Sequence, residues 1–305
     1  MAIVTYSSNA DGGQPPITLG CVFRPQFPPE QLAAAARTAD DAGVDELWLW
    51  EDCFAHGGIA SAAIALANSQ TVTVGIGVLP IPLRNVALTA MEIATLERAF
   101  PGRLRVGVGH GVQDWMGQVG AQVASPLTLL REYLQCLRAL LRGDSVTYKG
   151  RYVSLDEVRL EWTPKAEIPL LSAAGGPKTM QLSGELASGT ILTGGTSPHG
   201  VRAALAEIAA GQAKNDPSAK HAVVVNVVCA TGPDAEAAAA AEIQRSGFDA
   251  SACVTAHGNA EQIADSARQW VSAGASTVVL QPTPEVNVQS FLEFVGGTVR
   301  QRFLG

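Results

Sequence analysis

Positive charge is scarce in this sequence, and it is not concentrated in any one stretch. The chain of 305 residues has 21 lysines and arginines against 28 aspartates and glutamates, which gives a formal net charge of -7. Nucleic-acid binding requires clustered positive charge, because the protein has to neutralise phosphates. The composition therefore argues against a nucleic-acid partner.

Long apolar runs are missing too. The most apolar stretches, such as residues 222–230, have the length of a strand and are shorter than the ~20 residues that span a membrane. Residues 1–16 are polar and rich in glycine and proline, and they lack the basic start and apolar core of a signal peptide. We expect a cytoplasmic protein without a membrane partner, in which residues 1–16 form a loose leader.

Cysteine is rare as well. The five cysteines stand at positions 21, 53, 136, 229 and 253, and no two of them have the Cys-x-x-Cys spacing. This pattern suggests neither a disulfide framework nor a zinc site, so we expect no bound metal. Most of these thiols should be small buried apolar groups.

A regular alternation of short apolar runs and amphipathic segments dominates the rest of the chain. Each apolar run is followed by a segment with leucine and alanine at helical spacing. Eight strands alternating with helices favour a closed (β/α)8 TIM barrel over two open sheets, and we expect residues 17–305 to form one such domain. The predicted strands cover residues 17–23, 45–50, 72–78, 103–109, 168–174, 190–192, 221–230 and 275–281.

Insertions are expected after the fourth and seventh strands. Residues 144–166 break the alternation and predict a hairpin, whereas residues 110–124 are punctuated by glycines and predict a loop. After the seventh strand, two predicted helices flank a second insertion. Two local signals mark helix ends: Gly43 is placed to end the first helix, and Asn85 to cap the helix over residues 86–100.

Two successive predicted strands end in glycine-rich turns. The fifth strand stops at Gly175-Gly176, and Pro177 then opens a helix; the sixth strand ends in Thr193-Gly194-Gly195. Glycines let backbone N–H groups approach a ligand, and a helix N-terminus favours an anion, so the pair predicts a phosphate site. The alternative is that the glycines only make tight turns. The predicted ligand-binding residues here are Ser172, Ala173, Ala174, Gly175, Gly176, Lys178, Thr193 and Gly194.

Titratable side chains follow the second and fourth strands. Glu51, Asp52 and Cys53 come after the second strand, and His110 stands between two glycines after the fourth. Active sites of such barrels lie at the C-terminal strand ends, so we predict proton transfer by Asp52 and Cys53 and a ligand or proton role for His110. The alternatives are that Glu51 or Asp52 caps a helix or pairs with an arginine, and that Cys53 is inert packing.

At these strand ends the chain resembles a known family. Residues 101–111, Pro-Gly-Arg-Leu-Arg-Val-Gly-Val-Gly-His-Gly, are similar to the signature of the bacterial luciferase-like flavin and deazaflavin oxidoreductases. Leu47-Trp48 leading to Asp52, the Gly75-x-Gly77-Val78-x-Pro80 stretch and residues 173–177 add to the resemblance. It extends from about residue 17 to residue 196, and more weakly to the end. The Ala-Ala-Gly-Gly-Pro stretch looks most like members that use 8-hydroxy-5-deazaflavin, coenzyme F-420.

The resemblance implies an oxidoreductase that passes a hydride between this deazaflavin and a small organic substrate. It implies that the ring lies at the barrel mouth on a cis peptide between Gly77 and Val78, and that the two glycine turns hold the phosphate. It also implies a homodimer, because barrels of this family commonly pair.

The chain departs from the family pattern at two positions. Cys53 stands where a histidine often follows the aspartate, and Val112 stands where some sugar-phosphate-oxidising members have glutamate. His56 and His110 are candidates to replace the missing imidazole. Two other functions stay open: an FMN-dependent monooxygenase that uses O2 and a separate reductase, and a cofactor-binding barrel without catalytic activity.

Overall fold

The centre of the molecule is a closed parallel barrel. The computed structural model describes residues 15–251 and 253–305, so most of the expected leader lies outside the described residues. Each barrel strand pairs in parallel with the next, and the last pairs with the first through Thr18 and Thr277, which confirms the predicted (β/α)8 fold. The barrel strands are β1 (Thr18–Phe23), β2 (Glu46–Leu49), β3 (Thr73–Pro80), β4 (Leu104–Gly109), β7 (Leu170–Ala174), β8 (Gly189–Leu192), β9 (Ala222–Thr231) and β11 (Thr277–Pro282).

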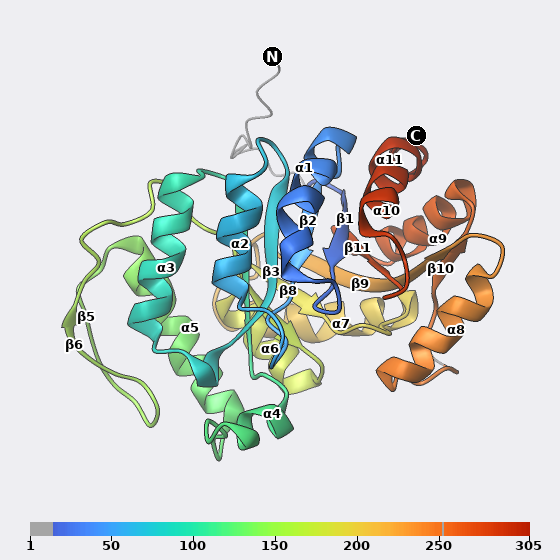
Figure 1. Cartoon of the computed structure of the whole chain (residues 1–305). Helices are drawn as coiled ribbons and strands as arrows, with labels where there is room; N and C mark the ends of the chain where they lie inside the picture. Colours follow the sequence, from blue (N-terminus) through green and yellow to red (C-terminus); the bar gives the residue numbers. More distant parts are fainter. Residues whose placement is uncertain (1–14, 252) are drawn as a thin grey trace.

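Helices surround the barrel (Figure 1). The predicted helix ends are confirmed, because Gly43 ends the first helix with φ 76° and the Asn85 side chain accepts a hydrogen bond from the backbone of Ala87. None of the helices in the described residues has the length and apolarity to span a bilayer. The surrounding helices are α1 (Leu32–Ala42), α2 (Gly58–Ala67), α3 (Val86–Ala99), α5 (Pro126–Arg142), α6 (Pro177–Leu186), α7 (Pro198–Gln212), α8 (Ala235–Ser246), α9 (Ala260–Ser272), α10 (Val288–Phe294) and α11 (Arg300–Leu304).

Both insertions lie where the sequence predicts them. After α5 the chain forms an antiparallel hairpin of β5 (Val146–Lys149) and β6 (Ser154–Val158). After α8 it adds the short strand β10 (Ala256–Gly258), which pairs with the end of β9. The loop expected over residues 110–124 needs a correction, because it contains the helix α4 (Gln113–Gln118). The side chain of Met116 in this short helix is completely buried, which the sequence around it did not predict.

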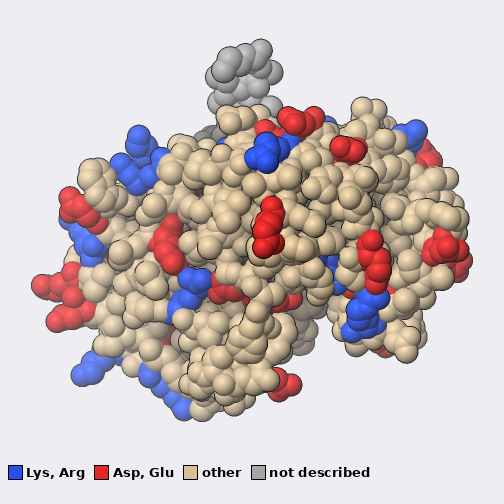
Figure 2. Space-filling model, in the orientation of Figure 1, with Lys and Arg blue, Asp and Glu red and all other residues tan. Residues whose placement is uncertain are grey.

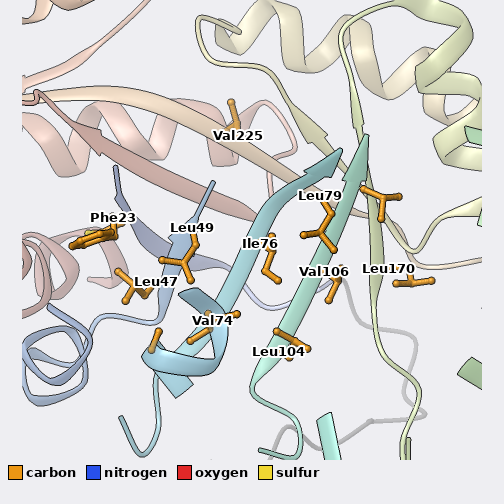
Figure 3. Close-up of a cluster of buried hydrophobic side chains, with 14 of the residues drawn as sticks. Phe23, Leu47, Leu49, Val74, Ile76, Leu79, Leu104, Val106, Leu170 and Val225 are labelled. Carbon is orange, nitrogen blue, oxygen red and sulfur yellow. The ribbon is translucent and has the colours of Figure 1, made fainter. Parts of the chain in front are cut away.

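The core has two layers because strand side chains alternate between the two faces of the barrel wall. Figure 3 shows the outer layer, in which Leu47, Leu49 and Ile76 are among the strand residues that point toward the helices. The inner layer fills the barrel itself. It consists of Val22, Trp48, Leu171, Ile191, Val224 and Val279, with Trp50 and Val78 packed against it.

Glycines on β1 and β3 make room for the largest inner residue. A Cβ atom added at Gly75 would overlap the Trp48 ring, and one at Gly20 or Gly77 would approach it within 3.0 Å. The glycines that support the family resemblance therefore have a packing role, since they let the indole of Trp48 occupy the barrel below its mouth.

A polar network closes the N-terminal end of the barrel. Glu46, which is fully buried, accepts hydrogen bonds from Trp48 Nε1 at 2.8 Å and Thr18 Oγ1 at 2.8 Å. It also forms an ion pair with Arg105 at 2.6 Å, and Arg105 donates to Thr277 Oγ1 at 3.0 Å. Every charge in this network has a partner, so this end is complete without a ligand.

Candidate active site at the barrel mouth

Glu51 has a structural role at the end of β2. Its carboxylate accepts a hydrogen bond from the backbone of Gly58, at the start of α2, at 2.5 Å. It also pairs with Arg84 at 2.8 Å, and Arg84 in turn pairs with Glu92. Both alternatives raised from the sequence, a helix cap and an arginine pair, therefore hold for Glu51.

The neighbouring Asp52 is different. Among the described residues its half-buried carboxyl has no hydrogen-bonding partner. Burial raises the pKa of Asp52 above its usual range, and the positive charges of Arg24 and His56 oppose this shift. A carboxyl with a raised pKa and free oxygen atoms is suited to proton transfer with a bound molecule.

Cys53 follows Asp52 as a partly exposed free thiol. Burial, together with the charges of Glu51 and Asp52, raises its pKa, so at neutral pH it is a thiol and not a thiolate. His56 lies close by and stacks on Phe23 with 5.9 Å between the ring centroids. Of the two histidines considered as substitutes for the missing imidazole, His56 is therefore the one near Asp52.

His110 points elsewhere. Its Nε2 lies 3.4 Å from the hydroxyl of Thr179, in the first turn of α6. Its Nδ1 is buried without a hydrogen-bonding partner among the described residues. Burial lowers the pKa of His110, and the backbone of Pro126 opposes this shift. The structure thus places a neutral imidazole beside the first glycine turn and apart from Asp52.

The end of β3 forms the floor of the mouth. The Gly77–Val78 peptide bond is cis, as the resemblance implies. Val78 is half-buried and packs on the inner layer that contains Trp48. Gly109 on the neighbouring strand leaves space for it, because a Cβ atom there would lie 2.9 Å from Val78 Cγ2. This floor is apolar and suits the face of a flat ring.

The first glycine turn is open to solvent. A Cβ atom at Gly176 would meet nothing within 4 Å, and one at Gly175 would meet only Thr193 at 3.8 Å. Lys178 is exposed in the first turn of α6. Exposed backbone at the N-terminus of a ten-residue helix, with a lysine nearby, fits a phosphate.

The strand before this turn contributes less than the sequence suggests. Ser172 and Ala174 are buried on the outer side of the barrel wall, whereas Leu171 belongs to the inner layer. Ala173 lies on the same face as Leu171 and is only half-buried. It is therefore the residue of this strand end whose side chain faces the mouth.

The second glycine turn is packed, in contrast to the first. A Cβ atom at Gly194 would lie 2.6 Å from the Phe248 ring, and one at Gly195 would lie 3.0 Å from it. These glycines make room for Phe248, which follows α8. Thr193, at the start of the turn, is exposed.

Other mouth residues were not anticipated. Glu242 on α8 is fully buried and accepts hydrogen bonds from Arg24 at 2.7 Å, Arg245 at 2.6 Å and Gln281 at 3.1 Å. This network holds α8 against the ends of β1 and β11. Asn226, within the valine run of β9, was also missed. The sequence signal that could have identified Asn226 is a polar residue inside an otherwise apolar strand.

Nothing else in the described residues competes as a catalytic centre. They contain no cluster of three or more histidine, cysteine or acidic side chains suited to a metal. A cavity of about 400 Å³ lies at the opposite end of the barrel, because its lining includes Leu170 and Ser188, at the start of β7 and β8. It is remote from the groups at the mouth.

Comparison with known proteins agrees with this arrangement. The chain is 30% identical over 214 residues to the 5,10-methylenetetrahydromethanopterin reductase of Methanolobus tindarius, which covers 70% of this chain and 65% of the relative. It is 31% identical over 199 residues to the F420-dependent glucose-6-phosphate dehydrogenase of Nakamurella multipartita, covering 60% of this chain and 58% of the relative. The matched part thus spans less than two thirds of these relatives' length.

Solved structures share the fold. The coenzyme F420-dependent tetrahydromethanopterin reductase of Methanopyrus kandleri superposes with a TM-score of 0.82 at 18% identity, covering 94% of this chain and 99% of that one. An F420-dependent secondary alcohol dehydrogenase, solved with an F420-acetone adduct, gives 0.83 at 20% identity with the same coverage. The luciferase-like monooxygenase family matches residues 2–275. The chain therefore belongs to the luciferase-like monooxygenase family.

Proposed function

We propose that this protein is an oxidoreductase that binds 8-hydroxy-5-deazaflavin, coenzyme F-420, at the barrel mouth and exchanges a hydride between it and a small organic substrate. The observation that carries the proposal is the open turn at Gly175 and Gly176. It lies at the positive end of α6, at the same end of the barrel as the apolar floor at Val78 and the unpartnered carboxyl of Asp52. The names of the relatives in sequence and fold point to the same coenzyme.

In this proposal each region of the mouth has its own task. Val78, backed by Trp48, supports the ring, and the open glycine turn holds the phosphate. Lys178 lies where an anionic tail would leave the turn. The bound deazaflavin would supply the hydride chemistry. Asp52 holds or accepts the proton that accompanies hydride transfer on the substrate, and Cys53 lines the site as a neutral thiol.

The test is a comparison of cofactors. Purified apoprotein is titrated side by side with the deazaflavin and with FMN, and turnover is then measured with and without oxygen. We expect tighter binding of the deazaflavin and activity that survives the removal of oxygen. Tight FMN binding with strictly oxygen-dependent product formation would instead establish a monooxygenase that needs a separate reductase. Binding without hydride exchange would point to a cofactor-binding barrel.

We also propose that two copies of the chain pair through α2 and α3, which lie side by side (Figure 1). The α2 segment has no charged residue, and its outer face exposes Ala60 and Ile64. On α3, Leu88 and Met91 are exposed, Met91 by 56%. A face on which α2 has no charge and Glu92 of α3 is already paired with Arg84 meets a second copy of itself across a two-fold axis with little repulsion between like charges.

Light scattering of Met91→Glu tests this pairing. The variant should shift the measured mass from two chains to one, whereas Leu304→Glu, an exposed leucine on α11, should not. A wild-type mass of one chain would refute the dimer. On the face shown in Figure 2, charges of both signs are scattered. The five free cysteines support a further proposal, that the protein works in the reducing cytoplasm.

A further inference from the structure

Asn226 occupies an unusual place inside the barrel. It lies on β9, two residues beyond Val224, so it faces the interior one step above the inner layer. The next residue on the same face, Val228, is covered by α8 through Ala235 and Ala239. Asn226 is thus a polar residue on the interior face between two apolar clusters, and it is 8% exposed.

The amide oxygen of Asn226 has no hydrogen-bonding partner among the described residues. This Oδ1 atom is one of two buried side-chain atoms in the described residues without a hydrogen bond, and the other is Nδ1 of His110. Buried amides are nearly always paired, so an unpaired one on the wall of a ligand site indicates a group that arrives with the ligand. Gln281, also at the mouth, differs because it already donates to Glu242.

The neighbouring strand shows which part of a ligand would reach Asn226. β8 pairs with β9 as far as Leu192 and Val225, and this register then sets Thr193 beside Asn226. Thr193 begins the second glycine turn, and Ile191 below it belongs to the inner layer. Asn226 therefore faces the space above the inner layer, next to the strand that leads into the second glycine turn.

We propose that Asn226 hydrogen-bonds the hydroxyl-bearing chain that joins the ring of a bound deazaflavin or flavin to its phosphate. This inference rests on the proposed function, since it assumes a ring at the floor and a phosphate at the turns. A hydroxyl group both donates and accepts, so it matches the N–H₂ and C=O ends of the amide. Asn226 is then a positioning residue for the bound cofactor.

The test uses Asn226→Leu, which removes the amide and keeps a similar volume. The free variant should unfold at the same temperature as the wild type or at a higher one, because an unpaired buried amide is replaced by an apolar group. Its affinity for the deazaflavin ring that carries the polyol without a phosphate should fall about tenfold. Its affinity for the same ring with a methyl group in place of the polyol should not change.

Thr190→Val is the matched control. Thr190 on β8 is also buried, but its hydroxyl is paired with Ser183 at 2.7 Å and with His221 at 2.8 Å. Removing the Thr190 hydroxyl should lower the unfolding temperature. It should leave the affinities for the polyol-bearing ring and for the methyl-bearing ring unchanged, whereas Asn226→Leu should weaken binding of the polyol-bearing ring. The two variants together separate a structural polar group from a ligand-binding one.

The remaining outcomes decide against the inference. A lower unfolding temperature for free Asn226→Leu would make the amide a structural group. Unchanged affinity for the polyol-bearing ring would overturn its role in binding, and equal losses for both rings would overturn the assignment to the polyol. If the wild type itself binds neither the deazaflavin nor FMN, the proposed function is refuted and this inference with it.

Discussion

The two ends of the barrel differ in whether every polar side chain has a partner. At the N-terminal end, the charges of Glu46 and Arg105 are paired with each other and with neighbouring hydroxyl groups. At the C-terminal mouth, the carboxyl of Asp52 and buried atoms of His110 and Asn226 have no partner in the described residues. Both ends are built from the same strands, so the contrast does not come from the fold itself.

This difference separates stability from function. Polar groups that are satisfied within the chain contribute to the free energy of folding, whereas unsatisfied groups lower it unless a ligand completes them. Substitutions at the N-terminal end should therefore change the free energy of unfolding. Substitutions of the unpartnered groups at the mouth should change binding or turnover, with little loss of stability.

The largest effect is expected for Glu46→Gln. It leaves the charge of Arg105 inside the barrel without its counterion, which should lower the free energy of unfolding by about 3 kcal/mol or more. Urea unfolding measures this, and Asp144→Asn is the control, because the exposed Arg142–Asp144 pair should be worth less than about 1 kcal/mol. An equal loss in the free energy of unfolding for both variants would show that the buried N-terminal network stabilises the fold no more than an exposed ion pair does.

Asp52→Asn should have the next largest effect, and on turnover instead of stability. Losing a proton donor or acceptor should reduce kcat by roughly 10²–10⁴-fold, and Cys53→Ser should be milder. Because the pKa of Asp52 is raised in the folded state, its ionisation opposes folding as pH rises through that pKa. The asparagine variant should therefore be at least as stable as the wild type at pH 7, and the pH profile of kcat should lose the limb that follows the ionisation of Asp52. A collapse of turnover in Cys53→Ser but not in Asp52→Asn would exchange the two roles.

A smaller effect, on cofactor binding, is expected for Gly176→Val. Its extended backbone, with φ -136°, accepts valine, and nothing lies within 4 Å of the added Cβ, so the fold should be unchanged. The side chain would occupy the space that a phosphate needs and should weaken binding by more than about tenfold, which corresponds to ~1.4 kcal/mol. Gly194→Val is the contrasting variant: it would collide with Phe248 and should lower the unfolding temperature. Full cofactor affinity in folded Gly176→Val would refute the phosphate site.

The smallest effect is expected for Lys178→Ala. Lys178 is exposed, so its contact with an anionic tail is screened by salt and should be worth about 1 kcal/mol or less. Affinity for the deazaflavin should fall a few-fold at low salt, and the difference from wild type should vanish at high salt. Lys165→Ala, at the opposite end of the barrel, should have no effect. A loss that does not depend on salt would contradict an electrostatic contact.

Local signals were enough for the barrel. The eight strands lie within two residues of the predicted ranges at every end, because a buried strand appears in the sequence as an apolar run bounded by turn residues. Gly43 and Asn85 act at helix ends through their own backbone or side chain, so their neighbours in sequence are sufficient to identify them. The helix α4 was missed because it is only six residues long and lies in a stretch punctuated by glycines.

The sequence by itself determined which residues follow each strand, since glycines, carboxylates and histidines stand at the predicted strand ends. Only the tertiary structure decided which of them are free for a ligand. Glu51 and Asp52 are adjacent and chemically alike, but Arg84 from another unit of the barrel engages only the first. Gly176 and Gly194 follow similar strands, but Phe248 fills the space beside only the second. The physical reason is that a partner's identity depends on distances through space, which the spacing of residues along the chain does not contain.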